Sequence, residues 1–476
     1  MRAGGLGGTR RARTAVSAKA FFRFVGWSSN QAANASRWVS KTTISEFREA
    51  VYQKVIWRPA AILDLMDALT IAGHGNSPVA LSESPMFRRK FSSVYDALVH
   101  GDLGEGLKDL FSESQDPDWE TIAGYEVHAI DATPHERMAA ETLEDRGALK
   151  AQQKEAVRYG HKSSWLVRLV QSGTSWVAPE AVERISTATT DTQVGAQQVK
   201  DLARRNPHPK VITADSRYRD QHFLGAFAGL ENTHALVRLQ NNQKLSQAPV
   251  PKPKGSRGAP RKHGADFHLT DISRPPDARE EFLLGKQNVR VRVWHKLHFK
   301  RLAKVVGSVV CVEFLKEDGT PRYKRPLWLF WTGPEEVTPH NLCRMYLWRF
   351  AIEHLFRFLK QHLGLNSNRS SNLESLQRWR WIVALAYWQV LLLRNTVKPN
   401  RPAWHPHKKD DQDKPLTPAQ VQRSAQTFLL RSGSPAANVR PAGKGHGRQK
   451  GYHPAPRKRF DIVFKTKKAH TLPKIC

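Results

Sequence analysis

Four strand-like segments and one helix-like segment lie between residues 125 and 218, and their order limits the possible folds more than any other feature. The strand-like segments are rich in β-branched and aromatic residues and read YEVHAIDAT, HKSSWLVRLV, TSWVAPEAV and VITADSRY. The segment VGAQQVKDLARR has a helical pattern and precedes the last of them. The order strand, hairpin, helix, strand predicts an α/β sheet.

Helical patterns come before this region, from Glu46 to about Asp118. Apolar residues recur three and four positions apart in SEFREAVYQKVIW, AAILDLMDALTIAG and MFRRKFSSVYDALVHG, and a glycine ends two of these patterns. After the sheet region, Gln240–Gly264 is rich in Pro, Lys and Gly and predicts a loop or a solvated basic lobe. The segments VRVWHKLHFK, KVVGSVVCVEFLKEDG and PLWLFWTG then predict further strands.

The charge balance indicates a polyanionic partner. The chain has 75 Lys and Arg against 43 Asp and Glu, which leaves a net charge of +32. Nucleic acid is the first candidate, because each neutralised phosphate releases counterions. An anionic membrane is the rival, but the longest apolar run, WIVALAYWQVLLL, is shorter than the roughly 20 residues of a bilayer helix. We therefore expect a buried core helix there and no membrane partner.

The cysteines and the chain ends suggest a cytoplasmic protein with basic extensions. None of Cys311, Cys343 and Cys476 is spaced as a zinc ligand set, and a reducing compartment fits them. The first 45 residues have no acid and superficially resemble a transit peptide, but we expect a disordered basic arm or a start codon assigned too early. The tail contains one helical pattern, TPAQVQRSAQTFLLRSG, and then GKGHGRQKGYHPAPRKRF, which we expect to be extended or disordered until it meets a partner. It is either a minor-groove arm or a non-specific basic tail.

The segment YLWRFAIEHLFRFLK, from Tyr346 to Lys360, predicts one two-faced helix. At roughly 100° per residue, its polar side chains fall within about 80° of one another, and they are Tyr346, Arg349, Glu353, Arg357 and Lys360. A solvated face with an Arg349–Glu353 pair is one explanation of this stripe. A functional site is the other.

Two aspartates favour the functional site. Asp131 ends the strand-like YEVHAID and Asp215 ends VITAD, and residues at such strand ends line the crevice where α/β proteins bind ligands. Together with Glu353 they could hold two divalent ions about 3.5–4 Å apart, an arrangement used in phosphoryl transfer. Oxygen ligands favour Mg²⁺ or Mn²⁺. The basic residues and Tyr346 would then hold a phosphodiester backbone.

Other residues nearby leave alternatives open. The possible replacements for the three acids are Asp220, Glu335, Glu336 and Glu374. The residues His135, Glu136 and Arg137 follow the first acid, and we expect them on a loop surface rather than on DNA or a metal.

The pattern Y-x2-R-x3-E-x6-K, formed by Tyr346, Arg349, Glu353 and Lys360, resembles the signature of bacterial insertion-sequence DDE transposases. The segments IDAT and ITADSRY resemble the surroundings of that family's first two acids. Three further segments resemble sequences found before and after the third acid in the same family: RGAPRKHG, LWLFWTG and KQHLGLNS. The resemblance implies a ribonuclease H-like core interrupted by a mainly β insertion. It also implies Asp131, Asp215 and Glu353 as catalytic metal ligands, two Mg²⁺ ions, and DNA contacts by Tyr346, Arg349, Arg357 and Lys360.

The resulting prediction is an α/β DNA transposase that cuts transposon ends and transfers the 3′-OH into target DNA, as a homodimer in the bacterial cytoplasm near the nucleoid. Its alternatives are a metal-dependent nuclease or resolvase with the same core, and an inactive DNA-binding relative. We expect a basic arm at residues 1–45 and a helical DNA-binding domain at 46–118. The catalytic core is expected in two pieces, 119–239 and 326–397, with the β-rich basic insertion at 240–325 between them. A basic tail is expected at 398–476.

Overall fold

The computed structural model describes most of the chain. The described residues are 43–72, 77–103, 106–149, 157–250, 259, 261–270, 273–398, 415–439, 447 and 449–464. The predicted basic arm, apart from its last three residues, and parts of the predicted tail lie outside the described residues.

Short helices form the amino-terminal part, as the sequence predicts. They are α2 (Ile44–Lys54), α3 (Pro59–Ile71), α4 (Pro78–Ser82), α5 (Ser92–His100) and α6 (Leu107–Glu113). Helix α2 begins with a capping box, because the Thr43 hydroxyl accepts from the Glu46 amide and the Glu46 carboxylate accepts from the Thr43 amide.

A thirteen-stranded mixed sheet and further helices form the rest of the described fold, so the molecule is α/β. Its strands are β1 (Thr121–Ile122), β2 (Tyr125–Glu136), β3 (Gly147–Leu149), β4 (Arg158–Leu169), β5 (Val177–Ile185), β6 (Lys210–Ala214), β7 (Thr233–Arg238), β8 (Lys244–Gln247), β9 (Asp266–His268), β10 (Ala278–Leu284), β11 (Gln287–Phe299), β12 (Leu302–Leu315) and β13 (Leu327–Trp331). The strand order is β3-β4-β2-β6-β7-β13-β12-β11-β8-β9, with β5 paired to β4, β10 to β11 and β1 to β2.

Helices cover both faces of the first half of this sheet. Strand β2 is antiparallel to β4 and parallel to β6, and β6 is parallel to β7. Ile130 and Ile212 pack with α7 (Asp191–Arg205) and α8 (Gln221–Gly225), whereas Ala129 and Val211 belong to the cluster with α9 (Pro339–Trp348), α10 (Ala351–Gln361) and α11 (Leu373–Leu393). This division follows from the alternation of side chains along a strand.

The second half of the sheet is formed by the segment between β7 and β13, here called the β8–β12 region. Strand β13 joins it to the first half, because it is antiparallel to both β7 and β12. The expectation of a loop across Gln240–Gly264 is partly wrong, since β8 lies inside this stretch and pairs with β11. Its Leu245 is fully buried, which explains a strand in an otherwise basic sequence.

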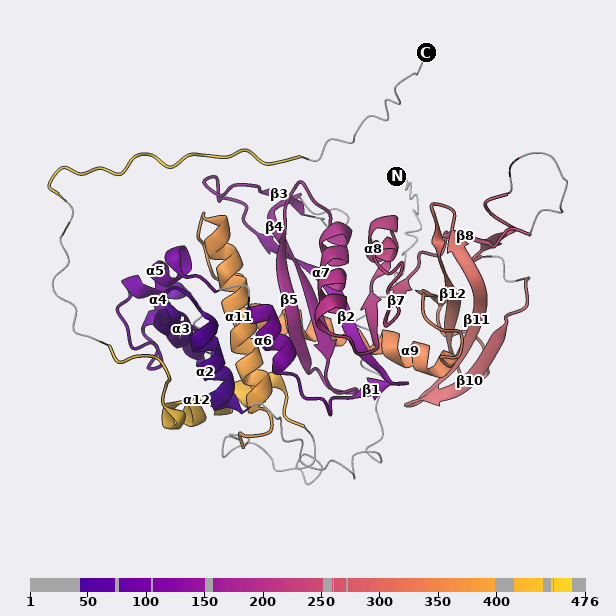
Figure 1. Ribbon diagram of the computed structural model, residues 1–476, viewed down its shortest axis with the longest axis horizontal. Helices are drawn as coiled ribbons and strands as arrows, with labels where there is room; N and C mark the ends of the chain where they lie inside the picture. Colours follow the sequence, from indigo (N-terminus) through magenta and orange to yellow (C-terminus); the bar gives the residue numbers. More distant parts are fainter. Residues whose placement is uncertain are drawn as a thin grey trace, which may run out of the picture.

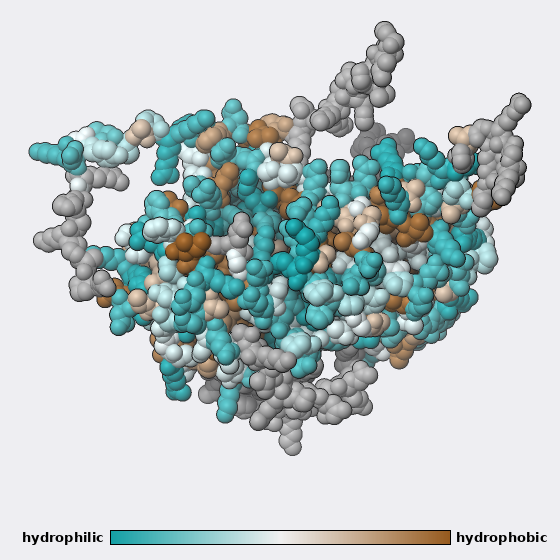
Figure 2. All heavy atoms as spheres, in the orientation of Figure 1, coloured by the Kyte–Doolittle hydropathy of each residue, from teal (hydrophilic) through white to brown (hydrophobic). Residues whose placement is uncertain are grey.

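Figure 1 shows the helical part and α11 at one end, the sheet in the middle and the β8–β12 region at the other end. Figure 2 shows that the same face is largely hydrophilic, with a few hydrophobic patches. Within the described residues, no helix is long and apolar enough to span a membrane. The apolar run at residues 381–393 is instead the buried half of α11, as predicted.

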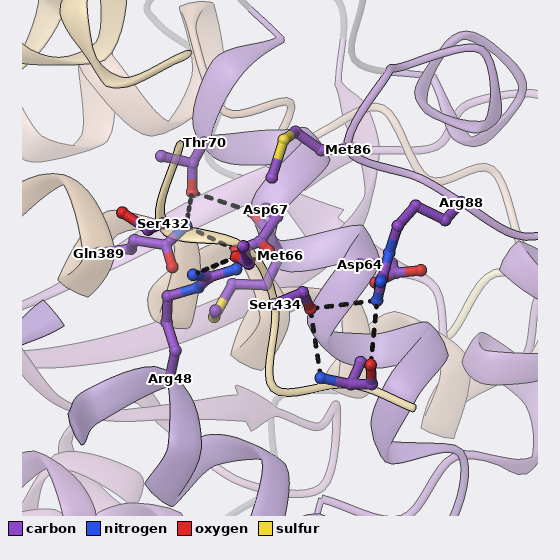
Figure 3. Close-up of polar contacts among 12 residues, drawn as sticks. Arg48, Asp64, Met66, Asp67, Thr70, Met86, Arg88, Gln389, Ser432 and Ser434 are labelled. Carbon is purple, nitrogen blue, oxygen red and sulfur yellow. Dashed lines mark hydrogen bonds and ion pairs between the residues drawn. The ribbon is translucent and has the colours of Figure 1, made fainter. Parts of the chain in front are cut away.

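Buried polar contacts join the amino-terminal helices to α11 and to the segment after α12 (Pro418–Ser432), as Figure 3 shows. Arg48 of α2 pairs with Asp67 of α3 at 2.6 Å, and both side chains are almost fully buried. The amide of Gln389 on α11 donates to Asp67 and to Thr70. These contacts fix the orientation of the helical part on the sheet domain.

Candidate active site

Asp131 and Asp215 lie side by side where two parallel strands stop pairing. The last parallel pair of β2 and β6 is Ile130 with Ala214, and each aspartate directly follows one of these residues. Asp215 therefore ends its strand as predicted. Asp131 does not, because β2 continues to Glu136 through pairing with β4 alone.

Glu353 comes from the face of the sheet that α9, α10 and α11 cover, in the first turn of α10. The prediction of one helix from Tyr346 to Lys360 is wrong, because α9 ends at Trp348 and α10 begins at Ala351. At the junction the amides of Arg349 and Phe350 donate to carbonyls three residues back, and this tighter turn interrupts the α-helical pattern. A carboxylate in a first helical turn is favoured by the helix dipole.

Arg349, in the junction between the two helices, connects two of the three carboxylates. Its guanidinium donates to Asp131 at 3.3 Å and lies 3.8 Å from the Glu353 carboxylate. Asp215 makes a different contact, because its carboxylate accepts from the Arg217 amide at 2.8 Å and caps the 3₁₀ turn Ser216–Tyr218. The site thus contains three acids and one largely buried cation.

The electrostatics of the site disfavour three free negative charges. Burial raises the pKa of Asp131, and the charge of Asp215 adds to this effect while Arg349 opposes it. Burial also raises the pKa of Glu353, with Asp131 and Asp215 adding and Arg349 opposing. Burial alone would lower the pKa of Arg349, but Tyr346 and the three acids raise it, so the guanidinium stays charged. A further cation would stabilise the ionised carboxylates.

The remaining residues of the predicted polar stripe differ in exposure. Tyr346 is buried, with the Arg349 guanidinium 6.0 Å from the centre of its ring. Arg357 is exposed, and its charge lowers the pKa of Glu353. Lys360 is half-buried, and burial lowers its pKa while Glu136 opposes this effect. Arg357 is therefore the most accessible of the four.

A pocket of about 120 Å³ opens beside Glu353 and Arg349. Its other wall comes from β12 and the segment before β13, including Phe314, Tyr323 and Arg325. The β8–β12 region therefore reaches the candidate site.

The donor chemistry of the three acids fits a hard divalent cation, since carboxylate oxygens are the ligands of Mg²⁺ and Mn²⁺. Among the described residues, no three His, Cys, Asp or Glu side chains are close enough together to hold a metal as they stand. Arg349 supplies positive charge between Asp131 and Glu353 in this arrangement. The residues therefore fit such an ion by the chemistry of their donor atoms.

The alternative acids are placed in other roles. Asp220 caps α8 and accepts from the Thr192 hydroxyl at 2.6 Å. Glu374 is exposed in the first turn of α11, and Glu335 is exposed as well. Glu336 lies near Tyr125, at the start of β2 rather than at Asp131.

Sequence reasoning missed a buried support behind the site. The expectation of a loop surface for His135 and Arg137 is wrong, because both are buried and only Glu136 is exposed. His135 hydrogen-bonds Asn366 at 2.7 Å, and Arg137 donates to the carbonyls of residues 368, 369 and 370. These contacts tie the strand of Asp131 to the loop after the helix of Glu353. The sequence did contain a signal for this support. His135 and Arg137 lie an even number of residues after Asp131, so an extended strand places them on the same face as Asp131.

A known protein family matches the segment of the chain in which these residues lie. A sequence model described as "Transposase DDE domain" matches residues 123–389, a segment that contains Asp131, Asp215 and Glu353. No curated protein matches the chain. The family match covers more than half of the chain, so this protein belongs to the family defined by the transposase DDE domain.

Proposed function

We propose that this transposase cuts DNA at the ends of its mobile element and joins the freed 3′-OH to target DNA. The observation that carries the proposal is the convergence of Asp131 and Asp215, beside the Ile130–Ala214 pair, with Glu353 through Arg349. All of these residues lie inside the matched family segment.

We also propose that β5-β4-β2-β6-β7 is a ribonuclease H-like core. Its support is the order of a three-stranded antiparallel unit followed by two parallel strands, with Asp131 on the central strand. In this proposal the β8–β12 region is an insertion between two pieces of the core, and residues 46–118 form a helical DNA-binding domain.

The proposed cofactor is a pair of Mg²⁺ ions, replaceable by Mn²⁺, held by Asp131, Asp215 and Glu353. Bound there, the ions would activate the attacking oxygen and stabilise the leaving oxygen of the phosphodiester. The chain's own part is to hold the three carboxylates ionised, which Arg349 favours by lowering the pKa of Asp131 and of Glu353.

The proposed substrates are element-end DNA and target DNA, bound by a homodimer in the bacterial cytoplasm, near the nucleoid. The net charge of +32 supports a polyanionic substrate. Arg357 and Lys360 follow Glu353 on α10 and would contact phosphates directly. Arg349 and Tyr346 would do so only after leaving their present partners.

The test is cleavage and joining of a labelled duplex that carries the element's own end, with Mg²⁺ and with EDTA. The native protein should produce metal-dependent nicks at the end and then joined products. Asp131→Asn and Glu353→Gln should each lose both reactions, whereas Glu374→Gln, which changes an exposed acid outside the site, should keep them.

Nicks without joined products would instead identify a nuclease or resolvase. Unchanged cleavage in Asp131→Asn or Glu353→Gln would show that the acids are assigned wrongly. Binding without any cleavage by the native protein would identify an inactive DNA-binding relative.

A further inference from the structure

The segment Gln449–Phe464, here called the strap, begins with a turn in which the Tyr452 amide donates to the Gln449 carbonyl. It is extended after this turn, anchored at its other end and strongly basic beside the anchor. It runs along the top of Figure 1, near β3. Arg457, Lys458 and Arg459 are consecutive and exposed. The segment continues into residues that pair with the protein backbone, so these three charges have a defined place on the surface.

Backbone contacts form the anchor. The Phe460 amide donates to the Glu141 carbonyl and the Val463 amide to the Arg146 carbonyl, each at 2.8 Å. Val463 also forms a parallel bridge with Gly147 of β3. The Arg146 guanidinium donates to the Phe460 carbonyl at 3.2 Å, and the ring of Phe464 meets Tyr159 edge to face.

The anchor lies near the end of the strand that carries Asp131. Gly160 of β4 pairs with Glu136 on one side and with Gly147 on the other. Asp131 is five residues before Glu136, so strand geometry puts the anchor about 20 Å from the first acid. Arg146 also donates to the Met138 carbonyl, in the turn that follows β2.

The charges beside the anchor are available to an anionic partner. Arg459 pairs with Glu141 at 3.1 Å, but both side chains are well exposed, and such pairs contribute little. Lys458 lies 5.1 Å from the ring centre of Phe460. Pro454 and Pro456 favour an extended backbone, which at about 3.1 Å per residue gives residues 453–459 a reach of roughly 20 Å.

We propose that the strap binds the phosphate backbone of duplex DNA seated at the carboxylate site, and that its anchor on β3 positions Arg457, Lys458 and Arg459 for this contact. A stiff, anchored segment loses less conformational freedom on binding than a free tail, so the anchor itself should add affinity. This inference rests on the proposed function for the identity of the DNA, but not on cleavage.

The experiment measures binding of a labelled element-end duplex by fluorescence anisotropy over a range of KCl concentrations. All proteins are full-length and carry Glu353→Gln, so that no cleavage occurs. Changing Arg457, Lys458 and Arg459 to Gln should lower affinity at least about tenfold at 0.1 M salt and make the slope of log K against log salt less negative by about 2–3. Arg457→Lys with Arg459→Lys should bind like the parent.

A second pair of variants tests the anchor without changing charge. Val463→Pro with Phe464→Ala removes one backbone donor and one ring contact, and should lower affinity at least about threefold. Ala455→Pro adds a proline in the extended part, outside the anchor, and should bind like the parent.

Two results would overturn the inference. Parent-like binding after removal of the three charges would show that the strap does not contact DNA. Parent-like binding by the anchor variant, with weak binding by the charge variant, would show a non-specific tail that needs no placement. Failure of the native protein to cleave would count against the proposed function alone, because these affinities are measured without cleavage.

Discussion

At the scale of single residues, Arg349 is the charged residue that contributes most to the electrostatics of the candidate site, because its guanidinium contacts two of the three acids. Replacing Arg349 with Ala should raise the pKa of Asp131 and of Glu353 further, since Arg349 lowers both. Cleavage at pH 7 should fall about ten- to hundredfold, as for other residues that support metal ligands. The acidic limb of the pH–cleavage profile should move to higher pH.

Arg349→Lys separates charge from shape. A lysine keeps the positive charge but cannot present two donors in a fork, so its pH profile should lie between those of the native protein and Arg349→Ala. A loss of cleavage with no displacement of the acidic limb would contradict the assigned electrostatic role.

Lys210, which lies outside the candidate site, should make the stability of the fold depend on pH. It is fully buried at the start of β6, its ammonium donates to the carbonyls of Asn206 and His208, and burial lowers its pKa from 10.5 to about 8. Between these values the folded state binds fewer protons than the unfolded state, so stability rises with pH. The contribution is lost as pH falls through 8, and its full size is at most about 3 kcal/mol.

Urea unfolding at pH 8, 9 and 10 measures this rise. Lys210→Met should flatten it, whereas Lys244→Met, which changes an exposed lysine, should leave it unchanged. Equal rises in the native protein and in Lys210→Met would assign the pH dependence to other groups.

At the scale of elements, the sequence predicts most of the fold but not its interruptions. The sequence correctly predicts that Asp215 follows the end of a strand, because the buried strand β6 ends at Ala214. The extension of β2 past Asp131 depends on its partner β4, which the residues of β2 do not reveal. The junction after α9 is a tighter turn of backbone hydrogen bonds, which the helical pattern of its residues does not reveal. Strand β10, AREEFLL, pairs with β11 along its whole length, and its own residues do not reveal this partner.

The pair Arg48–Asp67 allows a prediction at the same scale, since it joins α2 to α3, and Asp67 also accepts from Gln389 of α11 (Figure 3). Asp67→Ala leaves a buried guanidinium without its carboxylate and should reduce the free energy of unfolding by about 3–5 kcal/mol. Asp96→Ala, which breaks the exposed pair of Asp96 with Arg58, should reduce it by about 0–1 kcal/mol.

Chemical unfolding measures both variants, and Arg48→Met combined with Asp67→Leu adds a check. The double variant replaces the buried pair by apolar side chains and should recover most of the loss. Equal losses in Asp67→Ala and Asp96→Ala would mean that burial of the Arg48 pair has no energetic consequence.

At the scale of the whole molecule, the apolar core crosses the predicted boundary at residue 118. One cluster contains residues of α2, α3, α5 and α6 together with α11 and the sheet. Phe111 of α6 stacks on Trp381 and on Trp388 of α11, and Phe47 of α2 also stacks on Trp388. The amino-terminal helices and the sheet therefore share one apolar core.

A chain that starts at residue 119 should consequently not be stable on its own. It exposes Trp388, which is fully buried in the intact protein, along with the apolar face of α11. We expect it to bind a hydrophobic dye and to aggregate on size-exclusion chromatography, because large exposed apolar patches promote association. A separate fragment of residues 43–118 should restore a soluble complex when the two are co-expressed, since it supplies the missing half of the core. A soluble, cooperatively unfolding 119–476 chain would instead establish two independent cores.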